Sequence, residues 1–377
     1  MLGEDLFVSE SVTPGHPDKL CDAIADAVVD ALLARDAAAT AEVECAVASG
    51  IVFLAARIAS RATVDMPAIA REVLAEVGYG EGHGGFDARR CSILTSLTDA
   101  APAPRDEAEP VADEHVNAFG FACDDTPALM PMPIMLAHRV ARAFDAARAA
   151  GALGALSPDA KAQVAVRYRE GRPEAIASVT LVCGGEAAAL AALPGRLGKA
   201  VLEPAFVGAP LGFDAGCAVL INPGGVRRGG GPETHPGLTG RKPGIDTYGE
   251  FSRQPQAALS GKDLGSIDRL GAYAARWAAK NLVAAGLARR CEVHLCYAAG
   301  RAAPASLRVR TEGTGVVPDA ELAARLAAVA DFRPGPLLRR FWAKPVLFRA
   351  LAAYGHVGRE DLDLPWEATD LAAALRG

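Results

Sequence analysis

Four side chains able to bind ions crowd a short turn near the start of the chain. Glu10, His16, Asp18 and Lys19 lie within the segment SESVTPGHPDKL. A histidine and a lysine can donate hydrogen bonds to phosphate oxygens, and carboxylates are oxygen ligands of the kind that Mg²⁺ prefers. The residue types in this turn therefore indicate a site for a polyphosphate and a hard metal ion.

A helix that begins directly after the turn would position these groups. Apolar residues recur at helical spacing over this stretch: Leu20, Ile24, Val28 and Leu32. Pro17 suits a first helical position. A helix N-terminus offers free backbone N–H groups and a partial positive charge, which favours anions. The same residues also fit a simpler alternative, a capped helix with a solvated charged turn.

Length and composition bound the class of protein. A chain of 377 residues suggests two or three domains. It is 51% hydrophobic and 22% charged, which is typical of a globular protein. The net charge of −6 argues against a general nucleic-acid binder. We find no apolar run of 18 residues and no signal-peptide core at the N-terminus, so we expect no membrane partner.

The cysteines point to the compartment. Eight of them are scattered along the chain without a CxxC pair, and several, such as Cys183 and Cys296, lie inside apolar runs. This pattern favours reduced, buried thiols in a cytoplasmic protein over disulfides or a zinc site.

Strand patterns and helix patterns alternate along the chain. Strands are predicted at 41–56 (two pieces), 90–97, 119–121, 157–170, 175–183, 218–222 and 291–299. Helices are predicted at 65–77, 131–149, 268–288 and 185–202, the last interrupted at Pro194. Residues 99–114 are rich in Pro, Ala and acids and read as a linker. We therefore expect an α/β (α+β) fold of three similar layered units, each a small mixed sheet plus helices.

Several segments resemble, in order, those of the S-adenosylmethionine synthetase (methionine adenosyltransferase) family. The opening stretch resembles the motif SES…GHPDK.CD.I.DA..D. Further matches are LMPMPIMLAHR at 129–139, SPDAKAQV at 157–164, INPGG at 221–225, GLTGRK…DTYG at 237–249, a segment opening SGKD at 260–293 and AYGHVGRE…PWE at 353–367. The resemblance implies pseudo-equivalent units at 1–104, 112–232 and 233–377, with segments interleaved between them.

The resemblance also implies a reaction. In this family ATP and methionine react in one displacement: the sulfur attacks C5′ of the ribose and tripolyphosphate leaves, to be hydrolysed to pyrophosphate and phosphate. The protein must hold the sulfur in line and neutralise a highly charged leaving group. ATP as substrate, Mg²⁺ and K⁺ as cofactors, and a homodimer or dimer of dimers with shared active sites are implied as well.

Matched positions supply the groups that this reaction needs. The family's phosphate-contacting basic residues fall on His16, Lys161, Arg241, Lys242 and Lys262, and Lys19 completes GHPDK. Its Mg²⁺ ligands fall on Asp18 and Asp268, and the carboxylate tied to K⁺ falls on Glu44. Any one of these fits an ordinary surface ion pair, but a whole set in register does not.

The acceptor end departs from the family. The glutamate that meets the methionine ammonium falls on Arg57, and a second acid near that ammonium and the ribose falls on His235. The lysine that meets the substrate carboxylate falls on Ser266, and an aromatic residue after INPGG falls on Arg227.

Two loop positions depart as well. The family's loop glutamine falls near Ala100, and the aspartate of its GAGDQG loop falls on Glu114, or on Asp113 if the alignment slips by one. An arginine in place of an acid inverts the charge that an ammonium would meet and suits an anionic group. Misaligned loops are the competing explanation.

Three functions stay open. The first is a family enzyme that transfers the adenosyl group of ATP, with methionine as the family's acceptor. The second is a specialised paralogue with an altered, anionic acceptor, or one that only hydrolyses polyphosphate. The third is a non-catalytic ATP-binding regulatory relative, against which the intact set of basic residues argues. For the dimer, the apolar runs 51–56 and 218–221 are compatible with a buried sheet face.

Overall fold

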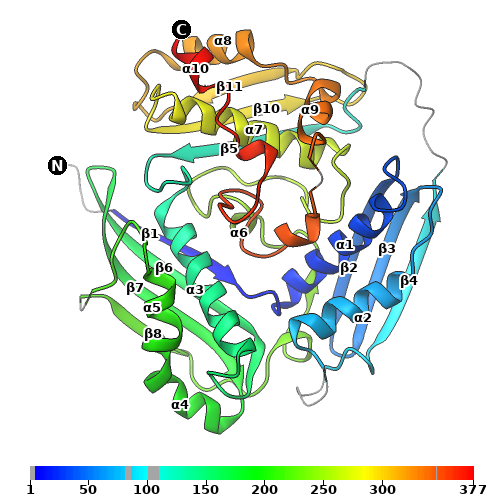
Figure 1. The fold of residues 1–377 in the computed structure, drawn as a ribbon, viewed down its shortest axis with the longest axis vertical. Coiled ribbons are helices and arrows are strands. Elements are labelled where there is room, and N and C mark those ends of the chain that lie inside the picture. Colours follow the sequence, from blue (N-terminus) through cyan, green and yellow to red (C-terminus); the bar gives the residue numbers. More distant parts are fainter. Residues whose placement is uncertain (1–4, 81–85, 101–109, 215, 345) are drawn as a thin grey trace.

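The computed structural model describes residues 5–80, 86–100, 110–214, 216–344 and 346–377. Figure 1 shows three sheet-and-helix units around a centre that holds the short helix α6 (Pro243–Asp246). The sheets have four, three and four strands. This confirms the predicted mixed α/β class with three layered units.

The first sheet has the order β4-β3-β2-β9. It comprises β4 (Ser92–Asp99), β3 (Ile51–Ala59), β2 (Thr40–Ala48) and β9 (Gly237–Leu238). Helices α1 (Pro17–Leu33) and α2 (Met66–Val77) cover one face, as Figure 1 shows. Period-two alternation places Val43, Cys45 and Val47 of β2 in the core and leaves Glu42 and Glu44 exposed on the other face.

The second sheet has the order β1-β6-β7-β8. Its strands are β1 (Asp5–Val12), β6 (Leu156–Arg169), β7 (Arg172–Gly185) and β8 (Ala218–Ile221), with helices α3 (Met132–Ala149), α4 (Ala187–Leu197) and α5 (Glu203–Phe206). The predicted interruption at Pro194 is wrong, because α4 continues through it. The irregularity follows instead at a π-helical turn, η1 (Gly198–Leu202).

The third sheet has the order β11-β10-β5. Its strands are β11 (Ser306–Arg310), β10 (Arg290–Tyr297) and β5 (Val116–Cys123). Helices α7 (Ile267–Ala284), α8 (Asp319–Val329), α9 (Pro334–Phe341) and α10 (Ala372–Arg376) belong to this end of the chain, with short 3₁₀ turns at η2 (Gly231–Glu233), η3 (Phe348–Leu351) and η4 (Pro365–Glu367). None of the described helices has the length and apolar character that crossing a bilayer requires.

Each sheet joins strands from distant parts of the chain. Antiparallel pairing joins β1 to β6, β2 to β9 and β5 to β10. Segments are thus interleaved between the sheets. A division into the linear units 1–104, 112–232 and 233–377 stays a prediction, and residue 104 lies outside the described residues.

A ladder of acids fastens α1 to loops from the C-terminal half. Asp18, Asp22, Asp26 and Asp30 recur every four residues, which places them along one side of the helix. Each accepts backbone N–H bonds: Asp18 from Leu238 (3.1 Å), Asp22 from Gly240 (2.7 Å), Asp26 from Gly261 (2.7 Å), and Asp30 from Phe348 (2.8 Å) and Arg349 (2.9 Å). We call these four residues the acid ladder.

A buried ion pair reinforces the ladder at its middle. The guanidinium of Arg269 lies 2.6 Å from a carboxylate oxygen of Asp26, and both side chains are 0% exposed. A pair so deeply buried is costly to break from one side, because the remaining charge is left without solvent or partner. The ladder therefore fixes α1 rigidly against α7 and its preceding loop.

Candidate active site

His16 caps the N-terminus of α1. Its Nδ1 accepts a hydrogen bond from the backbone N–H of Asp18 at 3.2 Å, so the proton of the neutral ring sits on Nε2. Burial lowers the pKa of His16 to about 3, and the charges of Lys161 and Lys242 act in the same direction while Asp159 opposes them. Nε2 is buried without a hydrogen-bond partner among the described residues. His16 thus presents a neutral N–H donor at the helix mouth.

Cationic side chains surround this donor. Arg241 extends to within 3.9 Å of Asp18, and Lys242 lies 3.0 Å from Glu10. Lys161 reaches the same place from β6 and is close enough to lower the pKa of His16. The structure therefore brings five predicted site residues together, which we call the α1 group: His16, Asp18, Lys161, Arg241 and Lys242.

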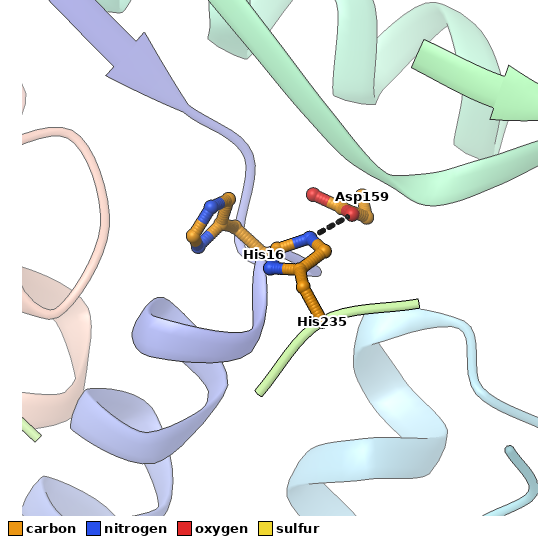
Figure 2. A group of neighbouring side chains, drawn as sticks. All are labelled: His16, Asp159 and His235. Atoms are coloured by element: carbon orange, nitrogen blue, oxygen red, sulfur yellow. Dashed lines mark hydrogen bonds and ion pairs between the residues drawn. The ribbon is translucent and has the colours of Figure 1, made fainter. Parts of the chain in front are cut away.

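His235 forms a dyad with Asp159, as Figure 2 shows. Its Nε2 lies 2.8 Å from Oδ2 of Asp159, which also accepts the N–H of Gly231 at 2.9 Å. Burial acts to raise the pKa of Asp159, but the bond from His235, the neighbouring His16 and the bond from Gly231 together leave it below its ordinary value. Asp159 is therefore ionised, and the proton of His235 sits on Nε2.

The dyad adjoins the α1 group. The rings of His16 and His235 are 4.9 Å apart between centroids. Potential ligand atoms of His16, Asp159 and His235 lie within 4.8 Å of one another, a spacing that a metal ion can bridge. His16 has no lone pair to give, however, since Nδ1 accepts from Asp18 and Nε2 carries the proton. The cluster is better described as hydrogen-bonding groups than as a metal centre.

A basic cavity opens beside the dyad. Its volume is about 270 Å³, and its lining includes Asp159, Lys161, Arg227, Arg228 and Thr234. The glycines of the adjoining loop permit close packing here: Gly231 has φ of +77°, and a Cβ at that position would lie 2.0 Å from the hydroxyl oxygen of Tyr79. The sequence-predicted Arg227 thus lines the same cavity as Lys161.

A larger cavity of about 600 Å³ lies elsewhere, between α7, α9 and the loop before η4. Its cations are already paired with acids: Lys280 with Glu367, Arg340 with Asp370, Lys344 with Asp363 and Arg359 with Asp361. It therefore offers little free charge to a polyphosphate.

A second set of predicted residues gathers at the start of α7. Lys262 forms an ion pair with Asp268, and Ser266 is the N-cap residue of α7. Burial raises the pKa of Glu44, and the charge of Lys262 partly offsets this. We call Glu44, Lys262, Ser266 and Asp268 the α7 group. Asp113 rather than Glu114 contacts it: Oδ1 of Asp113 accepts the N–H of Ile267 at 3.1 Å, whereas Oε2 of Glu114 accepts the N–H of the adjacent His115.

The two groups are separate within one chain. The backbone N–H of Gly261, the neighbour of Lys262, donates to Asp26. Asp26 lies eight residues after Asp18, a separation of about 12 Å along the axis of α1. Arg57 lies apart from His235 too. Arg57 is exposed on β3, where it lies opposite Glu42 of β2. Leu238, three residues after His235, pairs with Ala46 of β2. Glu42 and Ala46 are four residues apart, which is roughly 13 Å along the strand. Ala100 directly follows β4.

Lys19 lies in the interior. Its side chain is 0% exposed and its ammonium pairs with Asp22 at 2.9 Å and with Asp246. Burial is the largest influence on its pKa and acts to lower it, but the two carboxylates leave the pKa above the ordinary value. Lys19 is therefore charged and fully occupied beneath the α1 group.

Sequence reasoning missed two contributors to this site. Asp159 stands two positions before Lys161 on β6, so period-two alternation puts both side chains on one face of the strand. That spacing within SPDAK was a usable signal. The acid ladder carried a signal as well, in its four-residue period on a helix whose apolar stripe was already evident.

Comparisons with known proteins cover nearly the whole chain. Family models match at residues 4–102 (S-adenosylmethionine synthetase, N-terminal domain), 109–226 (central domain) and 229–368 (C-terminal domain). An S-adenosylmethionine synthase of Synechococcus sp. (strain JA-3-3Ab) is 42% identical over 98% of this chain and 97% of its own length. One of Desulforudis audaxviator is 42% identical over 100% and 98%, and one of Clostridium botulinum is 41% identical over 96% of each. The chain that builds the α1 group and the α7 group therefore belongs to the S-adenosylmethionine synthetase family of ATP-dependent adenosyltransferases.

Proposed function

We propose that this enzyme releases tripolyphosphate from ATP as it transfers the adenosyl group, and that its acceptor is a small anionic nucleophile rather than methionine. The nucleophile attacks C5′, the C5′–O bond breaks, and the electron pair leaves with the tripolyphosphate. Hydrolysis of the tripolyphosphate to pyrophosphate and phosphate completes the proposed cycle.

The α1 group supports the leaving-group assignment. Arg241, Lys242 and Lys161 supply positive charge, and the neutral His16 adds one N–H donor at a helix N-terminus. Such preorganised donors stabilise charge that develops on a leaving group. We assign Lys19 a supporting role, because its ammonium is enclosed by Asp22 and Asp246.

Metal ions fit the carboxylates of both groups. We propose that Asp18 and Asp268 hold Mg²⁺ and that Glu44 holds K⁺, since hard cations prefer such oxygen ligands. The ladder bond from Leu238 fixes the carboxylate of Asp18 at the helix mouth. Bound Mg²⁺ would neutralise charge on the leaving phosphate oxygens.

We propose a homodimer whose active sites are shared. This proposal is supported by the separation of the α1 group and the α7 group within one chain, because a second copy could bring the two groups of different chains together. Exposed apolar residues support an interface on the first sheet: Leu94 pairs with Phe53, Phe53 with Ala46, and Ala46 with Leu238, all on one face. Light scattering at micromolar concentration checks the assembly, and a monomer would contradict it.

The proposed location is the cytoplasm. All eight cysteines are free, and six of them are buried. Buried unpaired thiols fit a reducing compartment.

The single observation that carries the altered acceptor is the charge at the positions that should read an amino acid. A methionine zwitterion needs an acid for its ammonium and a donor for its carboxylate. Here the aligned positions hold Arg57, His235 and Ser266, and Arg57 is exposed. An ammonium that faces a guanidinium loses a hydrogen bond and gains repulsion.

Product analysis tests the proposal. The protein is incubated with ATP, Mg²⁺ and K⁺, with and without methionine, and the nucleoside and phosphate products are identified by mass spectrometry. We expect binding of ATP and slow or absent formation of S-adenosylmethionine. Efficient S-adenosylmethionine formation at ordinary methionine concentrations would return the chain to plain methionine adenosyl transfer. ATP binding without release of any nucleoside or phosphate product would instead favour a non-catalytic regulatory relative.

A further inference from the structure

We infer that the Asp159–His235 dyad is a general base, and that the acceptor attacks through an atom that carries a proton, such as the sulfur of an anionic thiol. This inference rests on the proposed function, because it names the acceptor class of the same site. It differs from that function in assigning a proton transfer, which the thioether sulfur of methionine does not require.

The dyad has the geometry of an oriented base. Nε2 of His235 is held at 2.8 Å by Asp159, whose Oδ2 is fixed in turn by the N–H of Gly231. The lone pair of the neutral ring is therefore on Nδ1, for which the described residues provide no hydrogen bond. The side chain of His235 is 27% exposed, whereas that of Asp159 is 7% exposed. A buried carboxylate behind a partly exposed imidazole is the arrangement that lets histidine accept a proton.

The surroundings suit an anionic acceptor. Arg227 and Arg228 line the adjoining cavity, and their charges would stabilise a thiolate and any carboxylate attached to it. The neighbouring His16 cannot act as the base, because its own lone pair accepts the N–H of Asp18. Of the three residues in Figure 2, His235 alone has a lone pair on nitrogen to offer.

The step balances without another reactant. The S–H proton passes to Nδ1 of His235, the sulfur forms a bond to C5′, and the C5′–O bond breaks with its electron pair leaving on tripolyphosphate. The product carries an uncharged thioether sulfur and keeps the anionic group of the acceptor. Methionine in the same step would give a sulfonium cation, which the basic cavity would disfavour.

A matched pair of probes tests the inference. The thiol 3-mercaptopropionate carries one carboxylate and an S–H, and 3-(methylthio)propionate is the same molecule with the proton replaced by a methyl group. Adenosyl transfer from ATP to each is followed by mass spectrometry, with tripolyphosphate release measured separately. We expect the unmodified enzyme to adenosylate the thiol and His235→Asn to lower that rate by roughly 100-fold or more at pH 7.

The pH dependence separates a base from a structural residue. A cysteine thiol ionises near pH 8.5 and a simple alkanethiol at a higher pH, so above the pKa of its own thiol the probe no longer needs a base. Above that pKa, the rate of thiol adenosylation by His235→Asn should be only severalfold below that of the unmodified enzyme. Other titratable or charged groups surround His235: His16 of the α1 cap and Asp159 of β6 contact it, and the charges of Lys161 and Lys242 reach the same cluster. All of these are unchanged between the two proteins, so the comparison isolates His235.

Two controls accompany the variant. His115→Asn alters an exposed histidine outside both groups and should leave the rates unchanged. ATP affinity of His235→Asn, measured by calorimetry, should stay within a few fold, which shows that the site is folded. A deficit equal at both pH values, or equal transfer to thiol and thioether, would overturn the base. Loss of ATP turnover with every acceptor would instead remove the proposed function.

Discussion

The mouth of α1 and the outer face of the first sheet differ in how the fold holds their charged residues. At the mouth, Asp18 and Lys19 are buried and each has partners from the C-terminal half of the chain. On the sheet, Arg57 and its cross-strand neighbour Glu42 are exposed. Residues at the mouth serve the fold as well as the site, so few replacements are compatible with stability. Arg57 and Glu42 are exposed instead, so replacements there cost the fold little.

The strongest expected effect concerns the buried side of this comparison. Asp26→Ala leaves Arg269 charged in the interior, so we expect the free energy of unfolding to fall by about 3–5 kcal/mol. Urea denaturation followed by circular dichroism measures it. Glu321→Ala removes a partner of Arg325 on the surface of α8 and serves as the control, with a loss within about 0.5 kcal/mol. Equal losses of unfolding free energy in the two variants would show that the buried pair stabilises the protein no more than a surface pair does.

The next effect concerns the three positions that would contact an amino-acid acceptor. The combined change Arg57→Glu, His235→Asp and Ser266→Lys restores the groups expected for an amino-acid acceptor. We expect methionine-dependent turnover to rise by roughly three orders of magnitude, equivalent to about 4 kcal/mol. Steady-state assays over a range of methionine concentrations measure it. No gain in the triple variant would mean that the loop alignment is wrong.

A smaller effect is expected for the leaving-group residues. Lys161→Ala and Arg241→Ala each remove one charge-assisted contact to the leaving group, which should raise the barrier by about 2–4 kcal/mol, or lower turnover by roughly 30- to 900-fold. Release of phosphate from ATP is the measurement. Unchanged turnover in both variants would show that the α1 group does not bind the leaving group.

The smallest effect is a pH dependence of stability. His16 and His138 are buried with pKa values lowered to about 3, chiefly by burial. A lowered folded-state pKa means that the unfolded chain binds more protons below pH 6.5, so stability falls as the pH drops from 6.5 towards 3. At pH 5.5 each histidine should remove ~1.4 kcal/mol.

His138→Gln isolates one of these contributions. The variant cannot take up a proton on unfolding, so its melting temperature should fall less between pH 7.5 and pH 5.5 than that of the unmodified protein. His115→Asn, at an exposed position, should not change the slope. Parallel slopes for all three proteins would rule out buried His138 as a source of the acid sensitivity.

Local patterns predicted much of the fold. Period-two and period-3.6 spacing located β6, β7, α1, α3 and α7 to within a few residues of their observed bounds. Elements beyond residue 299, such as β11 and α8, were not predicted, although SLRVR alternates and Leu322, Leu326 and Val329 recur at helical spacing. Pairing of β1 with β6 or β9 with β2 could not be predicted from spacing, since it joins segments more than 140 residues apart.

The site was predicted from family resemblance rather than from spacing. Family resemblance named the α1 group and the α7 group, and the structure assembles each of them. It did not name Asp159, because the contact of that residue is with His235, which lies 76 positions later in the chain. Nor did it reveal that Lys19 is enclosed, which depends on Asp246 from α6. Both facts concern contacts between distant segments, which no local pattern contains.

The acid ladder also sets an order of events during synthesis on the ribosome. Asp22, Asp26 and Asp30 are fully or largely buried, yet the backbone N–H groups that satisfy them belong to residues 240, 261, 348 and 349. Until those residues emerge, α1 cannot bury its acids without leaving them unpaired. The acidic face of α1 therefore stays exposed to solvent until more than 200 further residues have been synthesised, and only then can the N-terminal third of the chain reach its final packing. A nascent chain arrested before Gly240 should accordingly be far more protease-sensitive across α1 than one arrested after Arg349.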